Sequence, residues 1–169
     1  MINKNICLIG FMGSGKSSVA RRLSALCHRK VQSTDQMIEA QEKRTIAKIF
    51  EESGEAYFRK REEEAVCKAA QAQETIIDCG GGVVLNLKNI EALKQTGVVI
   101  YLSASPEFLF EKIQGRTHRP LLNVENPLSK MKEMLESRKA LYKQADYEVI
   151  SENKTIDQIA QEIIHLVDR

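Results

Sequence analysis

Residues 6–18 read ICLIGFMGSGKSS and decide the fold, because they place an apolar run, a glycine-rich turn and the start of a helix in immediate succession. Within this stretch, residues 10–17 (GFMGSGKS) match G-x-x-x-x-G-K-[ST], the pattern of a phosphate-binding loop. Glycine allows the backbone to take positive φ, so that successive N–H groups can converge on phosphate oxygens at the N-terminus of a helix. The stretch therefore predicts a site for nucleotide phosphates.

Two side chains of the loop have expected roles in this chemistry. Lys16 would reach the β- and γ-phosphates of a nucleotide, and Ser17 would offer its hydroxyl to Mg²⁺. The alternative is a turn that precedes a lysine by chance, but the strand pattern before the loop and the helix pattern after it favour nucleotide binding. We expect the nucleotide to be held by Gly13, Ser14, Gly15, Lys16, Ser17 and Ser18.

Size and composition indicate one globular domain over residues 1–169, since 169 residues with 43% hydrophobic side chains suffice for one core. The net charge of +2, from 25 basic and 23 acidic residues, gives no argument for a nucleic-acid or membrane partner. Without a signal-peptide pattern or an apolar run of membrane-spanning length, we expect a cytoplasmic protein, and we expect a monomer. The cysteines are scattered, which argues against a zinc site or a redox pair. They are Cys7, Cys27, Cys67 and Cys79.

Strand and helix patterns alternate along the chain. This alternation predicts an α/β fold, a parallel sheet covered by helices on both faces, with ligands at the carboxyl ends of the strands. Residues 115–126 are polar and basic with little periodicity, and we expect a mobile surface segment there. Strands are expected at 5–9, 30–33, 75–78, 98–102 and 147–150, and helices at 16–29, 34–39, 45–52, 55–71, 86–95, from 105 onward, 128–142 and 155–167.

Six short stretches of the chain carry a family pattern: GFMGSGKSSVARRLS (10–24), TDQMIE (34–39), FRKRE (58–62), CGGGVV (79–84), HRPLL (118–122) and, more loosely, ESRKALY (136–142). Taken in order, they resemble the shikimate kinase family from about residue 5 to 167. The resemblance implies a three-layer P-loop kinase fold, similar to that of nucleoside-monophosphate kinases, with a five-stranded parallel sheet of order 2-3-1-4-5. It also implies ATP with Mg²⁺, and shikimate as the small-molecule acceptor, giving shikimate 3-phosphate and ADP in aromatic amino-acid biosynthesis.

The chemistry of shikimate can be set beside this resemblance. A carboxylate needs a fixed cationic fork, and ring hydroxyls need hydrogen-bond acceptors. By similarity, Arg59 and Arg138 would bind the carboxylate, and Asp35 would accept hydrogen bonds from ring hydroxyls and is a candidate base for the attacking one. Composition alone would favour a different interpretation, in which Arg59 is a solvated helix residue among other charged side chains. The helices at about 34–62 would then form the substrate-binding region.

A triple glycine follows the strand expected at 75–78. It is either a flexible turn between strand and helix or a place where backbone N–H groups approach the substrate without a Cβ in the way. The resemblance favours contact with shikimate, with Gly81 and Gly82 as donors. The neighbouring Cys79 is either sensitive to alkylation or a buried, inert thiol.

The resemblance also implies a lid at about residues 115–126. Arg119 matches the arginine that the family brings over the transferred phosphoryl group, where it would stabilise negative charge. Arg116 is a candidate second cation near the nucleotide.

One departure from the family pattern concerns the metal. The family usually has Asp-x-Asp at the end of the second strand, whereas this chain has Ser33-Thr34-Asp35. Asp78 ends an apolar run that resembles a Walker B strand, and we hypothesise that it supplies the carboxylate that Ser33 lacks. The alternative is that Asp78 is an ordinary strand-end residue and that Ser17 and the phosphates hold Mg²⁺ alone.

Other functions remain open. Another small-molecule kinase of the same fold, such as a gluconate kinase or a nucleoside-monophosphate kinase, is disfavoured by FR-x-x-E together with the triple glycine. A weakened nucleotide-binding regulatory module is suggested by Ser33. Against it stands the presence of every expected functional side chain: Lys16, Ser17, Asp35, Arg59, Arg119 and Arg138.

Overall fold

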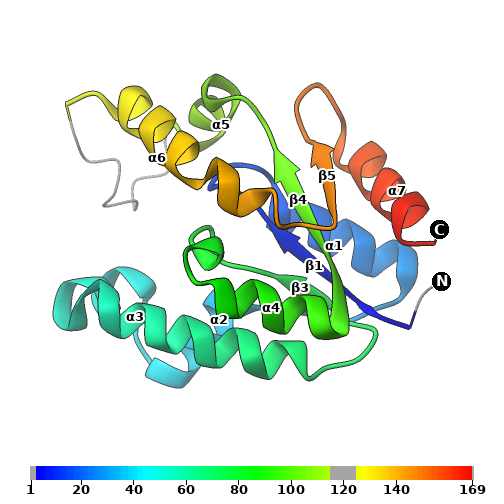
Figure 1. The fold of residues 1–169 in the computed structure, drawn as a ribbon, viewed down its shortest axis with the longest axis horizontal. Helices are drawn as coiled ribbons and strands as arrows, with labels where there is room; N and C mark the ends of the chain where they lie inside the picture. The colour runs from blue at the N-terminus through cyan, green and yellow to red at the C-terminus, as the bar shows by residue number, and fades with distance from the viewer. Residues whose placement is uncertain (1–2, 115–124, 169) are drawn as a thin grey trace.

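A parallel five-stranded sheet forms the centre of the computed structural model, which describes residues 3–114 and 125–168 (Figure 1). The strand order in this part of the chain is β2-β3-β1-β4-β5, and every neighbouring pair is parallel. The predicted α/β architecture and strand order are therefore confirmed. In chain order the elements are β1 (Asn5–Ile9), α1 (Lys16–Cys27), β2 (Val31–Ser33), α2 (Thr34–Glu42), α3 (Ile46–Ala70), β3 (Ile76–Asp78), η1 (Val83–Leu85), α4 (Leu87–Thr96), β4 (Gly97–Ser103), α5 (Pro106–Ile113), α6 (Pro127–Tyr142), β5 (Tyr147–Ile150) and α7 (Ile156–Val167).

Strand β1 lies in the middle of the sheet, between β3 and β4. All of its residues are buried, as expected for a parallel strand that helices cover on both faces. Leu8 pairs with Asp78 of β3 on one side and with Ile100 of β4 on the other. Gly10 follows directly after the strand, so the glycine-rich loop begins at the carboxyl edge of the sheet.

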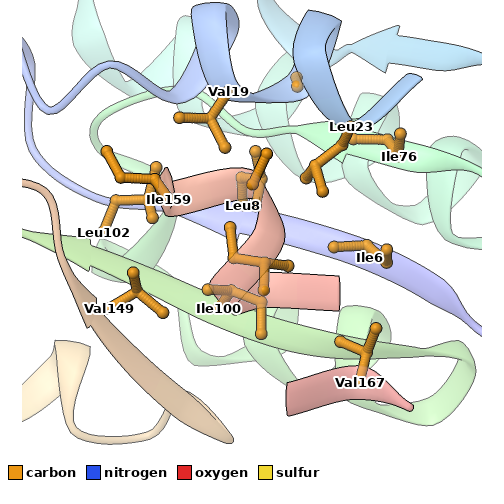
Figure 2. Packing of buried hydrophobic residues seen from close by; sticks show 13 residues of the cluster. Ile6, Leu8, Val19, Leu23, Ile76, Ile100, Leu102, Val149, Ile159 and Val167 are labelled. Carbon is orange, nitrogen blue, oxygen red and sulfur yellow. The ribbon is translucent and has the colours of Figure 1, made fainter. Parts of the chain in front are cut away.

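Two hydrophobic layers cover the sheet, one on each face. Alternate residues of β1 contribute side chains to one layer or the other, because successive side chains of a strand point to opposite faces. On the first face α1 and α7 pack against the strands, and Figure 2 shows the side chains that meet there. On the opposite face lie α3 and α4 (Figure 1). The first layer includes Ile6, Leu8, Val19, Leu23, Ile100, Val149 and Ile159, and the second includes Cys7, Ile9, Val66, Ile77, Ile90 and Val99.

Polar side chains mark the starts of several helices. Ser33, Thr45, Ser105 and Thr155 each accept a hydrogen bond from a backbone N–H in the first turn of the helix that follows. The helices expected at 45–52 and 55–71 join into α3, but Gly54 within it has φ 81° and ψ 172° and breaks the helical geometry. The predicted separation near Gly54 is therefore confirmed. The ends of the other elements differ from expectation by a few residues.

Membrane-spanning helices, clusters of metal ligands and cysteine pairs are features that the described residues can be searched for. Within residues 3–114 and 125–168, no helix combines the length and the apolar character needed to cross a membrane. The same residues contain no group of three or more His, Cys, Asp or Glu side chains placed to hold a metal ion. All four cysteines are free thiols, and Cys7 and Cys27 are buried, as expected.

Asn5 ties the start of β1 to the segment that connects α3 with β3. Its side chain is completely buried. The Nδ2 atom donates to the Ala72 carbonyl oxygen at 2.7 Å, and the Oδ1 atom accepts from the Thr75 backbone nitrogen at 2.9 Å. Removal of the amide would leave both backbone groups without these partners.

We expect Asn5→Ala to lower the free energy of unfolding by about 2–4 kcal/mol, because each buried polar group left unsatisfied costs about 1–3 kcal/mol. Urea denaturation measures the change. Gln41→Ala, which removes an exposed amide on α2, is the matched control and should stay within about 0.5 kcal/mol of the wild type. An Asn5→Ala variant as stable as this control would contradict the structural role of Asn5.

Candidate active site

The glycine-rich loop after β1 has a backbone that only glycine accommodates at its two tightest positions. Gly13 has φ 84°, and a Cβ there would lie 2.8 Å from the Leu109 carbonyl oxygen. A Cβ on Gly10 would lie 2.6 Å from the carbonyl oxygen of Leu102. Gly15, with φ 88°, begins α1, and its carbonyl accepts the first backbone hydrogen bonds of that helix. The loop thus brings backbone N–H groups to a helix N-terminus, a geometry that suits phosphate oxygens.

Lys16 lies against this loop. The side chain is buried, and its Nζ atom donates to the Gly10 carbonyl at 2.8 Å and to the Phe11 carbonyl at 3.1 Å. Both acceptors belong to the loop, so the ammonium group is positioned by the same turn that presents the backbone amides. The loop therefore supplies a fixed cation beside its N–H donors.

A cavity of about 330 Å³ at the carboxyl edge of the sheet brings the predicted phosphate and metal residues together. All six residues expected to hold the nucleotide line it. Asp35, from the first turn of α2, and Asp78, from the end of β3, line the same cavity, as does Gly81 of the triple glycine. The structure thus combines the phosphate loop with acidic and glycine positions that are distant in sequence.

Part of the cavity wall consists of residues that the sequence did not point to. Lys112 of α5 places its ammonium 5.0 Å from the centre of the Phe108 ring, and both residues line the cavity. The segment after β5 and the start of α7 add further lining residues. Their proximity follows from the position of β5 beside β4, and no local motif marks them. They are Ser151, Lys154 and Ile156.

The triple glycine lies against two carboxylates. A Cβ on Gly80 would lie 2.6 Å from Oδ1 of Asp35 and 3.1 Å from Oε1 of Glu62. The Gly80 backbone nitrogen also donates to Thr34 Oγ1 at 3.0 Å, which ties the turn to the start of α2. The absence of a side chain at Gly80 therefore lets the two carboxylates approach the turn.

Arg59 lies beside the same turn. Its Nη1 atom contacts Glu62 Oε2 at 2.7 Å, and its Nη2 atom contacts the exposed Glu55 at 3.1 Å. A Cβ on Gly82 would collide with the Arg59 guanidinium. Arg59 is thus held against the glycine turn by carboxylates of its own helix and is not a freely solvated side chain.

Arg138 reaches the turn from α6. The side chain is buried, its Nη1 atom donates to the Gly81 carbonyl at 3.3 Å, and its guanidinium lies 5.4 Å from the centre of the Phe11 ring. Arg59 and Arg138 therefore approach the triple glycine from different helices. The two cations and Asp35 are brought together, as an acceptor site for a hydroxylated carboxylic acid requires.

Glu62 is a site residue for which the sequence suggested no role. It is 1% exposed, and Oε1 has no hydrogen-bond partner among the described residues. Burial raises the pKa of this carboxyl and Asp35 raises it further, whereas Arg59 and Arg138 act to lower it. The signal was available, because Glu62 follows Arg59 by three residues and such a pair shares one helix face.

The predictions for Cys79, Arg116 and Arg119 differ in whether the described residues bear on them. Cys79 is 2% exposed, and burial raises its pKa well above the usual range of a thiol, so the buried, inert alternative is favoured over sensitivity to alkylation. Arg116 and Arg119, with most of the predicted lid, lie outside the described residues. Their roles stay predictions.

The raised pKa of Glu62 predicts how stability depends on pH. Because the folded-state pKa exceeds that of the unfolded chain, the stabilisation from protonated Glu62 is present below about pH 4.3 and is lost as the pH rises through the folded-state value. Glu62→Gln should therefore gain free energy of unfolding relative to the wild type as the pH rises through this window.

Urea denaturation of both proteins from pH 4 to pH 8 measures the effect. Each unit by which the pKa is raised corresponds to about 1.4 kcal/mol. Glu55→Gln removes an exposed carboxylate that contacts the same arginine and serves as the control. A difference between Glu62→Gln and wild type that is independent of pH would contradict the raised pKa.

Comparison with known proteins gives consistent results. The family described as "Shikimate kinase" matches residues 12–168. The shikimate kinase of Caldanaerobacter subterraneus subsp. tengcongensis is 44% identical, over 95% of this chain and 94% of its own. That of Thermodesulfovibrio yellowstonii is 40% identical, over 98% of this chain and 96% of its own.

Solved structures agree with these relatives. The shikimate kinase from Acinetobacter baumannii, in complex with shikimate, has a TM-score of 0.93 and 36% identity and covers 98% of this chain and 93% of its own. A gluconokinase from Sinorhizobium meliloti has a TM-score of 0.60 at 17% identity, which shows a shared fold alone. Because the family match spans nearly the whole chain and relatives of 40–44% identity cover it almost completely, this protein belongs to the shikimate kinase family.

Proposed function

We propose that this chain transfers the γ-phosphoryl group of ATP to a hydroxyl of shikimate, with Mg²⁺, giving shikimate 3-phosphate and ADP. The observation that carries the proposal is that residues of the phosphate loop, Asp35 and Gly81 line one and the same cavity. The complex of the Acinetobacter baumannii relative with shikimate supports the same acceptor.

The residues present suit a bound nucleotide and its metal. The Ser14 Oγ atom is buried and has no hydrogen-bond partner among the described residues. Because buried polar atoms are normally hydrogen-bonded, this hydroxyl suits a bound ligand that supplies the partner. It stands in the loop whose glycines allow close approach of the backbone. Lys16 supplies positive charge for the β- and γ-phosphates, and the hydroxyl of Ser17 is exposed in the cavity, where Mg²⁺ binds in other phosphate loops. When bound, Mg²⁺ neutralises charge that develops on the transferred phosphoryl group.

The acceptor side of the site is built from groups of opposite charge. Arg59 and Arg138 supply cationic forks for the carboxylate of shikimate, and Glu62 holds Arg59 against the glycine turn. Asp35 accepts hydrogen bonds from the ring hydroxyls and takes the proton of the attacking one. Gly81 and Gly82 offer backbone N–H groups to the substrate. Catalysis then consists mainly of positioning and charge stabilisation, as in other phosphoryl transfers.

We propose that residues 1–169 act as one domain, with the helices at about 34–62 as the substrate-binding region. The two shikimate kinase relatives support this, since the match covers 94–96% of their length. We also propose a monomer, because the described residues of one chain supply both the phosphate and the acceptor sides of the site and the chemistry proposed here needs no second copy. A cytoplasmic location fits the requirement for ATP.

An ADP-release assay with ATP and Mg²⁺ tests the proposed function directly. Shikimate, gluconate, quinate and a panel of nucleoside monophosphates are offered separately. We expect turnover with shikimate alone. Turnover with another acceptor in its place would assign the protein to a different kinase, and ATP binding without turnover on any acceptor would identify a regulatory nucleotide-binding module.

We expect Arg59→Lys to raise KM for shikimate by roughly 10- to 100-fold, because hydrogen bonds to charged groups contribute about 1.5–3 kcal/mol and lysine lacks the planar fork. KM for ATP should stay near the wild-type value. Arg61→Lys is the matched control, since Arg61 lies on the same helix but pairs with Glu42 and Glu64. Equal effects of the two substitutions on KM for shikimate would argue against the role of Arg59.

A further inference from the structure

The end of β3 places a carboxylate between two other strand ends. Asp78 pairs with Leu8 of β1 on one side and with Ser33 of β2 on the other. Parallel strands end at the same edge of a sheet, so this register sets Asp78 beside the phosphate loop that follows β1. Asp78 and Ser17 line the same cavity.

The Asp78 side chain lines the cavity and is largely enclosed by the protein. Its residue is 7% exposed. Within residues 3–114 and 125–168 its oxygens form no hydrogen bond or ion pair. A carboxylate at a cavity wall that forms no hydrogen bond or ion pair with these residues keeps its oxygens free to coordinate a metal ion, and carboxylates are oxygen ligands that Mg²⁺ prefers. The cavity that Asp78 lines therefore offers a place for a cation.

Ser33, the residue opposite Asp78, has a different function. Its Oγ atom accepts a hydrogen bond from the Gln36 backbone nitrogen at 3.4 Å and thereby caps α2. A neutral hydroxyl engaged in a cap is a weak partner for a hydrated divalent cation. The other carboxylate that lines the cavity is that of Asp35, whose Oδ1 lies against Gly80, on the acceptor side of the site.

We propose that Asp78 is the carboxylate that holds Mg²⁺ beside Ser17 in this chain, in place of an acidic residue at position 33. Mg²⁺ keeps several waters and binds through one or two carboxylates together with substrate phosphates. Phosphate-loop enzymes in general pair the loop hydroxyl with an aspartate at a strand end. In this chain Ser17 supplies the loop hydroxyl and Asp78 the aspartate at a strand end, and both line the same cavity. The inference rests on the proposed function, because the nucleotide supplies the other ligands of the metal.

The test measures Mn²⁺ binding to the protein with ADP by electron paramagnetic resonance, so that no turnover is required. Asp78→Asn should weaken Mn²⁺ binding by about 10- to 100-fold, as loss of a metal-supporting side chain does. Ser33→Ala should bind Mn²⁺ as the wild type does. The double variant Ser33→Asp with Asp78→Asn should recover most of the affinity, because it moves the carboxylate to the paired position.

Shikimate binding, measured by calorimetry, should be the same in Asp78→Asn and wild type, which shows that the variant is folded. Unchanged Mn²⁺ binding in Asp78→Asn, or a loss in Ser33→Ala of equal size, would overturn the assignment of Asp78. The ADP-release assay on the wild type separates this failure from failure of the proposed function. An active wild type with unaffected Asp78→Asn rejects only Asp78, whereas a wild type inactive on shikimate rejects the proposed function.

Discussion

The parallel pairing of β1 with β3 and β4 is the constraint on which the rest of this structure depends. It sets the phosphate loop, Asp78 and, through β3, Ser33 at one edge of the sheet. A slip of one residue in this register would turn each side chain of the moved strand to the other face. If β1 moved, Leu8 would leave the layer under α1 and α7. If β3 moved, Asp78 would turn to the opposite face of the sheet. Packing of the core and placement of the cavity are thus decided by the same hydrogen bonds.

Buried charge distinguishes the acceptor side of the site from the phosphate side. Around the triple glycine, the carboxylates of Asp35 and Glu62 lie near the cations of Arg59 and Arg138, and Glu62 and Arg138 are buried. The raised pKa of Glu62 shows that its burial is only partly compensated by the two arginines. Desolvation of this kind costs stability, but it leaves charged groups ready to bind an ion of opposite charge without reorganisation.

Glycine at a few positions is what lets these groups approach the backbone. Gly13 and Gly80 are the clearest examples, because a Cβ at the first would overlap the Leu109 carbonyl and at the second the Asp35 carboxylate. Gly13 lets the phosphate loop pack closely against α5. Gly80 lets the carboxylates of Asp35 and Glu62 approach the turn after β3. The glycine patterns that identify the family are therefore requirements of close packing between backbone and functional groups.

The sequence by itself determined the α/β architecture, the parallel sheet, the positions of the helices to within a few residues and the phosphate loop, since these follow from local patterns of apolar residues, helix caps and consecutive glycines. Resemblance to the family further indicated Asp35, Arg59, Arg138 and the triple glycine. Only the tertiary structure decided that Glu62 is buried, that Asp78 stands opposite Ser33 with no partner among the described residues, and that Phe108 and Lys154 line the cavity. The reason is physical: burial and register depend on contacts between segments far apart in the chain, which no local pattern encodes.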